Sequence, residues 1–141
     1  MNSNVIKAMY LSSEGRIGRL AYFGYSLALG IAYSILAVIL GMLLGMVGVI
    51  IALILYIALL YPQYNLAAKR FHDLNQPSQY ALYMIGAALV AGVLVQIPSL
   101  HMVGGLLDLL LLIVFLYLLF VPGTAGANSY GAAPNALPGV Q

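Results

Sequence analysis

Long apolar stretches dominate the chain and set its expected architecture. A helix needs about 20 predominantly apolar residues to cross a hydrocarbon core of roughly 30 Å, and residues 20–40 form the first such stretch. No charged residue occurs from Leu27 to Leu60, a length that would give one helix of about 50 Å at 1.5 Å per residue. Because one span cannot hold this stretch, the glycines within residues 41–48 are expected to mark a tight turn between two spans.

Two more apolar stretches follow, so that four spans fit the chain. Pro122 and Gly123 end the last of them, because neither residue continues a helix readily. The predicted fold is all-α: an integral membrane protein formed by a single four-transmembrane-helix bundle. The spans are predicted at residues 20–40, 48–66, 80–97 and 102–121, with an N-terminal segment at 1–19 and a tail at 122–141.

The positions of the cations predict the orientation. Lys7, Arg16 and Arg19 precede the first span, and Lys69 and Arg70 lie between the second and the third. The other two loops between spans contain no Lys or Arg. Since the loops on the cytoplasmic side carry the excess of Lys and Arg, both termini are expected in the cytoplasm.

Composition agrees with this picture and excludes several functions. The chain is 64% hydrophobic and 6% charged, against about 25% charged residues in soluble domains. A net charge of +2, without a basic run, gives no reason to expect nucleic acid as a partner. The chain has no cysteine, and its two histidines, His72 and His101, are expected on opposite sides of the membrane, so we expect no metal site and no cofactor.

Two polar segments flank the predicted cytoplasmic ends of the first two spans. In the first, Arg16, Arg19 and Tyr22 recur every three residues and are expected on one side of the entering helix, with a serine at position 12 or 13 as its cap. The arginines either anchor the helix to anionic headgroups or bind a dedicated partner.

The second segment ends the second span and contains an acidic residue, Asp73, that opposes the helix macrodipole. Lys69 or Arg70 could compensate this charge in part. A Lys four residues before an acid is the weaker orientation of such a pair, so Arg16 or Arg19 is expected as the main partner. That pairing would hold the cytoplasmic ends of two spans together.

A third segment, residues 122–134, has the Gly- and Pro-rich composition of a flexible tail. Together the three segments resemble the domain-of-unknown-function family 805, which comprises small bacterial inner-membrane proteins. The chain departs from the family pattern at Lys69, where an Arg is usual, at Gln79 and Tyr80, where two Trp are usual, and at Ser129 and Ala133. The matching positions are Gly15, Arg16, Arg19, Tyr22, Phe23, Arg70, Phe71, His72, Asp73, Gly123, Thr124, Gly126, Asn128, Tyr130, Gly131 and Pro134.

The resemblance implies a fold and a location but no activity. It also implies that the tail is a patterned segment, so we expect Asn128 and Tyr130 to dock against the cluster of Arg16, Arg19, Arg70 and Asp73. The predicted binding or structural cluster comprises Arg16, Arg19, Tyr22, Lys69, Arg70, His72, Asp73, Asn128 and Tyr130.

Three residues within the predicted spans also stand out. Asp108 is an ionisable group in the fourth span and is therefore a candidate functional residue. A structural hydrogen bond to Gln96 or His101 is its simplest interpretation, and an ion or proton pathway is the alternative. Tyr33 and Tyr56 fall mid-span and are expected to face neighbouring helices, because their hydroxyls need partners in a dry environment.

Three functions remain open at this point. The leading hypothesis is a non-enzymatic membrane protein whose polar cluster binds lipid headgroups or a protein partner, with a homo-oligomer as a further alternative. The second is a small transporter or channel component that uses Asp108. The third is an interfacial enzyme acting on lipids through His72 and Asp73, which is disfavoured because adjacent helical residues point about 100° apart.

Overall fold

The computed structural model describes residues 3–134, and the regular elements in this range are helices. The all-α prediction is therefore confirmed, whereas the parts of the predicted terminal segments at 1–2 and 135–141 lie outside the described residues. The helices are α1 (Ser3–Tyr10), α2 (Arg19–Leu44), α3 (Met46–Asp73), α4 (Gln79–Val95) and α5 (His101–Phe120).

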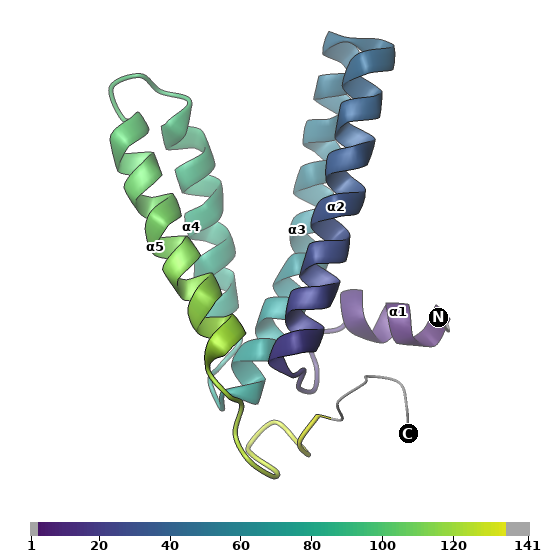
Figure 1. The fold of residues 1–141 in the computed structure, drawn as a ribbon, viewed down its shortest axis with the longest axis vertical. Coiled ribbons are helices and arrows are strands. Elements are labelled where there is room, and N and C mark those ends of the chain that lie inside the picture. Colours follow the sequence, from purple (N-terminus) through teal and green to yellow (C-terminus); the bar gives the residue numbers. More distant parts are fainter. Residues whose placement is uncertain (1–2, 135–141) are drawn as a thin grey trace.

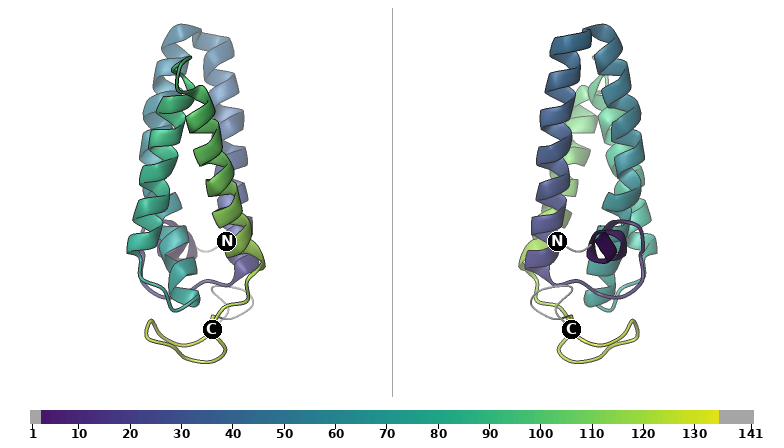
Figure 2. Two further views of the ribbon diagram at one scale, coloured as in Figure 1. Left: turned by 90° about the vertical axis from the view of Figure 1, so that its left-hand side faces the viewer. Right: turned by 90° about the vertical axis from the view of Figure 1, so that its right-hand side faces the viewer.

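The four longer helices form two antiparallel hairpins, α2–α3 and α4–α5, arranged as a V (Figure 1). The hairpins meet at one end, which we call the foot, and diverge toward their turns, which we call the tips. Helix α1 lies crosswise against α3 at the foot, where residues 121–134 also lie (Figure 2). The foot therefore gathers segments from both ends of the chain.

Three helices, α2, α3 and α5, are long and apolar enough to cross a membrane, and α4 is apolar with 17 residues. The predicted turn between the first two spans is present, and it is tighter than expected. Gly45 alone separates α2 from α3 and has a φ of 55°, a conformation that favours glycine. Gly48 allows the close return, because a Cβ there would overlap the Leu40 carbonyl.

The start of α2 corrects one prediction. Arg16 lies before the helix, which begins at Arg19 after Gly18, and no side chain caps its N-terminus. The Ser12 hydroxyl instead accepts a hydrogen bond from the Glu14 backbone N–H at 3.2 Å. The helix begins only at Arg19 because Gly18 directly before it has an extended backbone, with a ψ of 163°.

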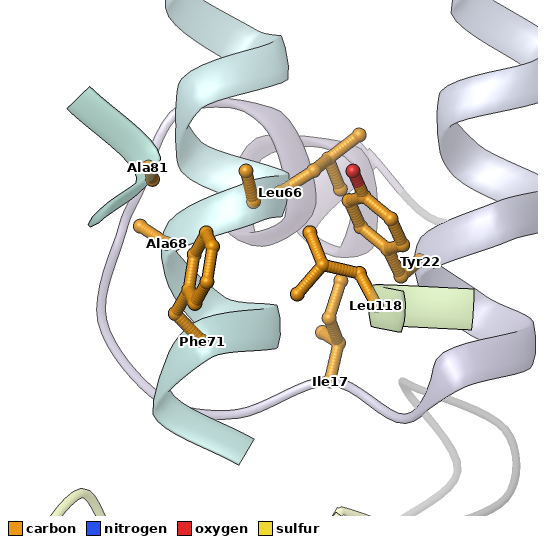
Figure 3. Close-up of a cluster of buried hydrophobic side chains, with 8 residues drawn as sticks. Ile17, Tyr22, Leu66, Ala68, Phe71, Ala81 and Leu118 are labelled. Atoms are coloured by element: carbon orange, nitrogen blue, oxygen red, sulfur yellow. The ribbon is translucent and has the colours of Figure 1, made fainter. Parts of the chain in front are cut away.

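The buried core lies at the foot, where Ile17, Tyr22, Leu66 and Leu118 meet from four segments of the chain (Figure 3). Toward the tips, large apolar side chains such as Met42 are exposed. Soluble monomers rarely expose contiguous apolar surfaces of this extent. The outer surface is therefore suited to contact with lipid.

Candidate functional site

At the foot, two arginines bind one carboxylate at the end of α3. The Asp73 Oδ1 atom accepts hydrogen bonds from Arg16 Nε at 3.1 Å and from Arg16 Nη2 at 2.9 Å. The other oxygen pairs with Arg70, and all three side chains are at most 3% exposed. The predicted Arg16 partner is thus confirmed, and Arg70 adds a second. Lys69 and Arg19 form no ion pair with Asp73.

Arg16 also binds the tail. Its Nη1 donates to the carbonyls of Gly126 at 2.7 Å and Gly131 at 3.1 Å, and its Nη2 donates to the Thr124 carbonyl at 2.7 Å. With the two bonds to Asp73, these contacts match the five N–H donors of a guanidinium group. The buried charge is therefore fully hydrogen-bonded, which is the condition for burying it at tolerable cost.

The tail caps the C-terminus of α3. The Thr124 N–H donates to the Asp73 carbonyl, and the Asn128 side-chain amide donates to the His72 carbonyl, both at 2.8 Å. The Tyr130 ring stacks on the His72 ring with 4.0 Å between centroids. The predicted docking of the tail is present, although Asn128 and Tyr130 contact His72 rather than the arginines. The composition-based expectation of a flexible tail is wrong for these residues.

Glycines in the tail permit this close contact. A Cβ at Gly123 would overlap the Asp73 carboxylate. Gly126 and Gly131 have φ values of 70° and 123°, which turn the backbone so that their carbonyls reach Arg16. We call this assembly of Arg16, Arg70, Asp73 and residues 123–131 the latch.

His72 and Asp73 have separate partners and do not form a dyad. The His72 Nδ1 atom lies 3.1 Å from the Gly15 carbonyl; since a carbonyl only accepts, Nδ1 carries the proton. Asp73 is occupied by the two arginines. Among residues 3–134, no group of three or more acidic or histidine side chains could hold a metal ion.

Side chains of α3 cap the C-terminus of α1, a helix that the sequence did not predict. The Lys69 ammonium donates to the Ala8 and Met9 carbonyls, and the Asn65 amide donates to the Tyr10 carbonyl at 2.8 Å. Helix C-termini leave their last carbonyls without partners and carry partial negative charge. Burial and the neighbouring Tyr25 raise the pKa of the Tyr10 phenol in this helix.

Arginines perform the same role at the end of α5. Arg70 donates through Nε to the Leu118 carbonyl at 2.7 Å and through Nη2 to the Val121 carbonyl. Arg19 donates through Nη1 to the Phe120 carbonyl at 3.2 Å. Arg70 is buried whereas Arg19 is exposed. The predicted cluster therefore contains cations that stabilise helix ends.

Between the two hairpins lies a cavity of about 720 Å³ open to the exterior, which we call the groove. Its wall on α2 includes Phe23, Leu27 and Ile31, which are exposed and share one face of the helix. Residues from all four long helices line it: Tyr22, Phe23, Ser26, Leu27, Leu29, Gly30, Ile31, Tyr33, Ser34, Ile35, Tyr56, Leu59, Leu60, Gln63, Met84, Ile85, Ala88, Leu111 and Phe115.

Few polar groups line the groove. The Gln63 amide donates to the Ser26 hydroxyl at 3.3 Å, and the Tyr33 hydroxyl donates to the Ala52 carbonyl at 3.3 Å. Tyr33 thus contacts the neighbouring helix as predicted, and Tyr56 packs on its ring but is 38% exposed. The Tyr22 hydroxyl is buried without a hydrogen bond of normal geometry, although Ser26 lies near it.

Asp108 is exposed and has no hydrogen bond or ion pair with any residue of the described chain. The predicted bond to Gln96 or His101 is therefore absent; the His101 Nδ1 atom lies 2.8 Å from the Pro98 carbonyl instead. On α5, helical spacing places Asp108 on the same side as Leu111 and Phe115, both of which line the groove.

Long apolar hairpins joined at one end by a buried polar cluster define a multi-pass membrane protein. The chain belongs to the DUF805 family, described as proteins of unknown function, whose model matches residues 10–132. The predicted family is thereby confirmed, and the match covers the latch and the groove. No curated protein and no solved structure matches the chain.

Proposed function

We propose that this protein is a non-enzymatic, four-span protein of a bacterial inner membrane that binds a membrane lipid in the groove. Helix α4 spans about 26 Å at 1.5 Å per residue and is antiparallel to α5 in its hairpin. If α5 crosses the bilayer, α4 returns through it. These dimensions support four spans.

The distribution of charge supports the foot as the cytoplasmic end. The five Lys and Arg lie on α1, before α2, at its first residue and near the end of α3. The turns at residues 44–46 and 96–100 contain no Lys or Arg. Because Lys and Arg are retained on the cytoplasmic side, both the N-terminal segment and the tail belong there.

The latch residues already bind one another, so we assign the binding of a ligand to the groove rather than to the polar cluster. Arg16, Arg70 and Asp73 are buried and bind one another, the tail and α5, so their hydrogen-bonding capacity serves the fold. The proposal rests on the groove. Its volume of about 720 Å³ lies within the range of roughly 300–1,000 Å³ that is typical of small-molecule sites.

An acyl chain suits the groove in character and in length. Most of the residues that line the groove are apolar, and Ser26, Tyr33 and Gln63 among its few polar side chains are hydrogen-bonded within the protein. The exposed apolar row from Phe23 to Ile35 extends about 18 Å along α2 at 1.5 Å per residue. That length is close to half of a hydrocarbon core of roughly 30 Å, the depth of one leaflet.

Filling the groove tests this function. Gly30 lines the groove and a Cβ there meets open space, so Gly30→Leu should fold and project into the lipid site. Native mass spectrometry of the full chain in mild detergent should show bound phospholipid in the wild type and an about tenfold weaker adduct in Gly30→Leu, equivalent to about 1.4 kcal/mol.

Gly24→Leu is the matched control, because Gly24 is exposed on the same helix and does not line the groove. It should retain wild-type lipid. Equal adducts in all three proteins would overturn the proposal, and a dimer disrupted only by Gly30→Leu would indicate a second copy in place of the lipid.

A second candidate function, ion or proton transport, is favoured by Asp108 alone. An exposed carboxylate without a partner is costly within a hydrocarbon core, and such groups commonly mark transport pathways. Purified protein in liposomes should then support a cation or proton flux that Asp108→Asn abolishes and Glu14→Gln does not. Absence of flux in the wild type would exclude this candidate.

A further inference from the structure

The cations at the foot differ in what they bind. Arg16 and Arg70 share Asp73, and Lys69 binds the last carbonyls of α1. Arg19 makes one hydrogen bond, to the Phe120 carbonyl, and no carboxylate in the described chain lies within 4.0 Å of it. Since a guanidinium has five N–H donors, most of the Arg19 donors are open.

Arg19 lies one helical turn from the end of the groove nearest the foot and is not among the residues that line it. It is the first residue of α2, and Phe23, Leu27 and Ile31 follow it at intervals of four residues along one face. All three line the groove and are exposed. A molecule lying along this row would have its polar end at Arg19 and its apolar end toward the tips.

The bond to Phe120 also fixes the Arg19 side chain in place. Phe120 ends α5, so the hydrogen bond joins the two hairpins where the groove begins. The guanidinium is therefore held between α2 and α5 rather than extended freely into solvent. A partly preorganised guanidinium with open donors is well suited to the planar, bidentate binding of a phosphate group.

We propose that Arg19 binds the phosphate of an anionic phospholipid whose acyl chain lies in the groove. This inference rests on the proposed function, because it assigns the headgroup of the lipid that occupies the same site. The Ser26–Gln63 pair, the polar contact deeper in this part of the groove, is hydrogen-bonded within the protein. Arg19 is thus the open polar group at the level where the headgroup would lie.

The charge around Arg19 favours an anionic headgroup over a zwitterionic one. Arg16, Lys69 and Arg70 are also at the foot, and the carboxylate of Asp73 is occupied by two of them. The ammonium of a zwitterionic lipid would therefore meet an excess of positive charge. The five Lys and Arg outnumber the two carboxylates at this end of the molecule, Glu14 and Asp73, so a phosphodiester without an ammonium, as in phosphatidylglycerol, is attracted more strongly.

A competition between two lipids with identical acyl chains tests the inference. The delipidated full-length protein is titrated with equal amounts of phosphatidylglycerol and phosphatidylethanolamine and examined by native mass spectrometry. The wild type should bind phosphatidylglycerol about tenfold more than phosphatidylethanolamine. Arg19→Gln should bring this ratio close to one while it retains lipid, because the apolar row is unchanged.

Lys7→Gln is the matched control, since it removes one exposed cation from α1 without altering the groove. It should keep the wild-type ratio. Glycerol phosphate, which lacks acyl chains, should not compete at the concentrations used, because the groove supplies much of the affinity. Circular dichroism and a single elution peak establish that each variant is folded.

The possible results separate the inference from the proposed function. A tenfold preference that persists in Arg19→Gln, or equal binding of both lipids by the wild type, would overturn the role of Arg19 and leave the groove as a lipid site. If the wild type binds neither lipid, or Gly30→Leu binds both as the wild type does, the proposed function fails and the inference fails with it.

Discussion

Asp73 has an unfavourable position in its own helix but is stabilised by neighbouring side chains. Its negative charge lies at the negative end of α3, where the macrodipole opposes it. Arg16 and Arg70 compensate the charge of Asp73, and other donors of the two guanidinium groups bind backbone carbonyls of the tail and of α5. One carboxylate thereby connects three segments that are distant in the sequence.

Removing this charge should release the tail. In Asp73→Asn, two buried guanidinium groups lose their counter-charge, and breaking a buried ion pair in this way typically costs about 3–5 kcal/mol. We expect a lower unfolding temperature in detergent and faster cleavage of residues 122–134 by a soluble protease. Both quantities can be measured on the same purified protein.

Glu14→Gln provides the comparison for that experiment, because it also removes one carboxylate and Glu14 is exposed and forms no ion pair within residues 3–134. It should change the unfolding free energy by less than about 0.5 kcal/mol. If Asp73→Asn were as stable and as protease-resistant as Glu14→Gln, the latch would not hold the tail.

The sequence predicted part of this site. The Arg16–Asp73 pair followed from the conflict between Asp73 and the macrodipole, because that argument requires a cation from elsewhere. The bonds of Arg19, Lys69 and Arg70 to helix C-termini could not be predicted, because their acceptors are backbone carbonyls. Every residue has a carbonyl, so only the tertiary fold determines which ones are near a cation.

At the level of elements, α1 depends on α3. Tyr61, Asn65 and Lys69 follow one another at intervals of four residues and bind the carbonyls of residues 8–11. A helix of eight residues is marginal alone in water. Its stability therefore comes from contact with this polar row, which the sequence displays as three polar residues at intervals of four in the second half of α3.

Asn65→Ala should loosen α1 selectively. The change removes the hydrogen bond to the Tyr10 carbonyl in a buried position, a loss of about 1–3 kcal/mol. Amide exchange of residues 3–10 should accelerate by tenfold or more, whereas α5 should exchange as in the wild type. Gln79→Ala, an exposed position on α4, should leave exchange in α1 unchanged. Equal exchange of α1 in all three proteins would contradict the capping role.

For the whole molecule, hydropathy and the glycines predicted the long helices and a tight turn within residues 41–48, because both follow from local residue types. The V shape and the groove could not be predicted in this way. Residues that line the groove, such as Leu27 and Ile85, have the same apolar character as residues that face outward, such as Val38. Periodicity therefore does not distinguish the surface toward the other hairpin from the surface toward lipid.

The proposed orientation can be tested directly, because the natural chain contains no cysteine. Single variants Met46→Cys at a tip and Ala132→Cys in the tail are treated with a maleimide that does not cross membranes. In intact cells with a permeable outer envelope, we expect labelling of Met46→Cys alone. Ala132→Cys should react only after the inner membrane is opened. The opposite pattern would reverse the orientation, and labelling of both would contradict four spans.

The latch also has a mechanical consequence. The hairpins are joined at the foot and separate toward the tips (Figure 1). A rotation of one hairpin relative to the other would therefore have its pivot in the latch. Helix α3 has 28 residues, which gives an arm of about 42 Å at 1.5 Å per residue. A rotation of about 10° at the pivot would carry the tip through about 7 Å on such an arm. A small rotation at the latch would therefore change the separation of the tips far more than it moves Arg16, Arg70 and Asp73 themselves.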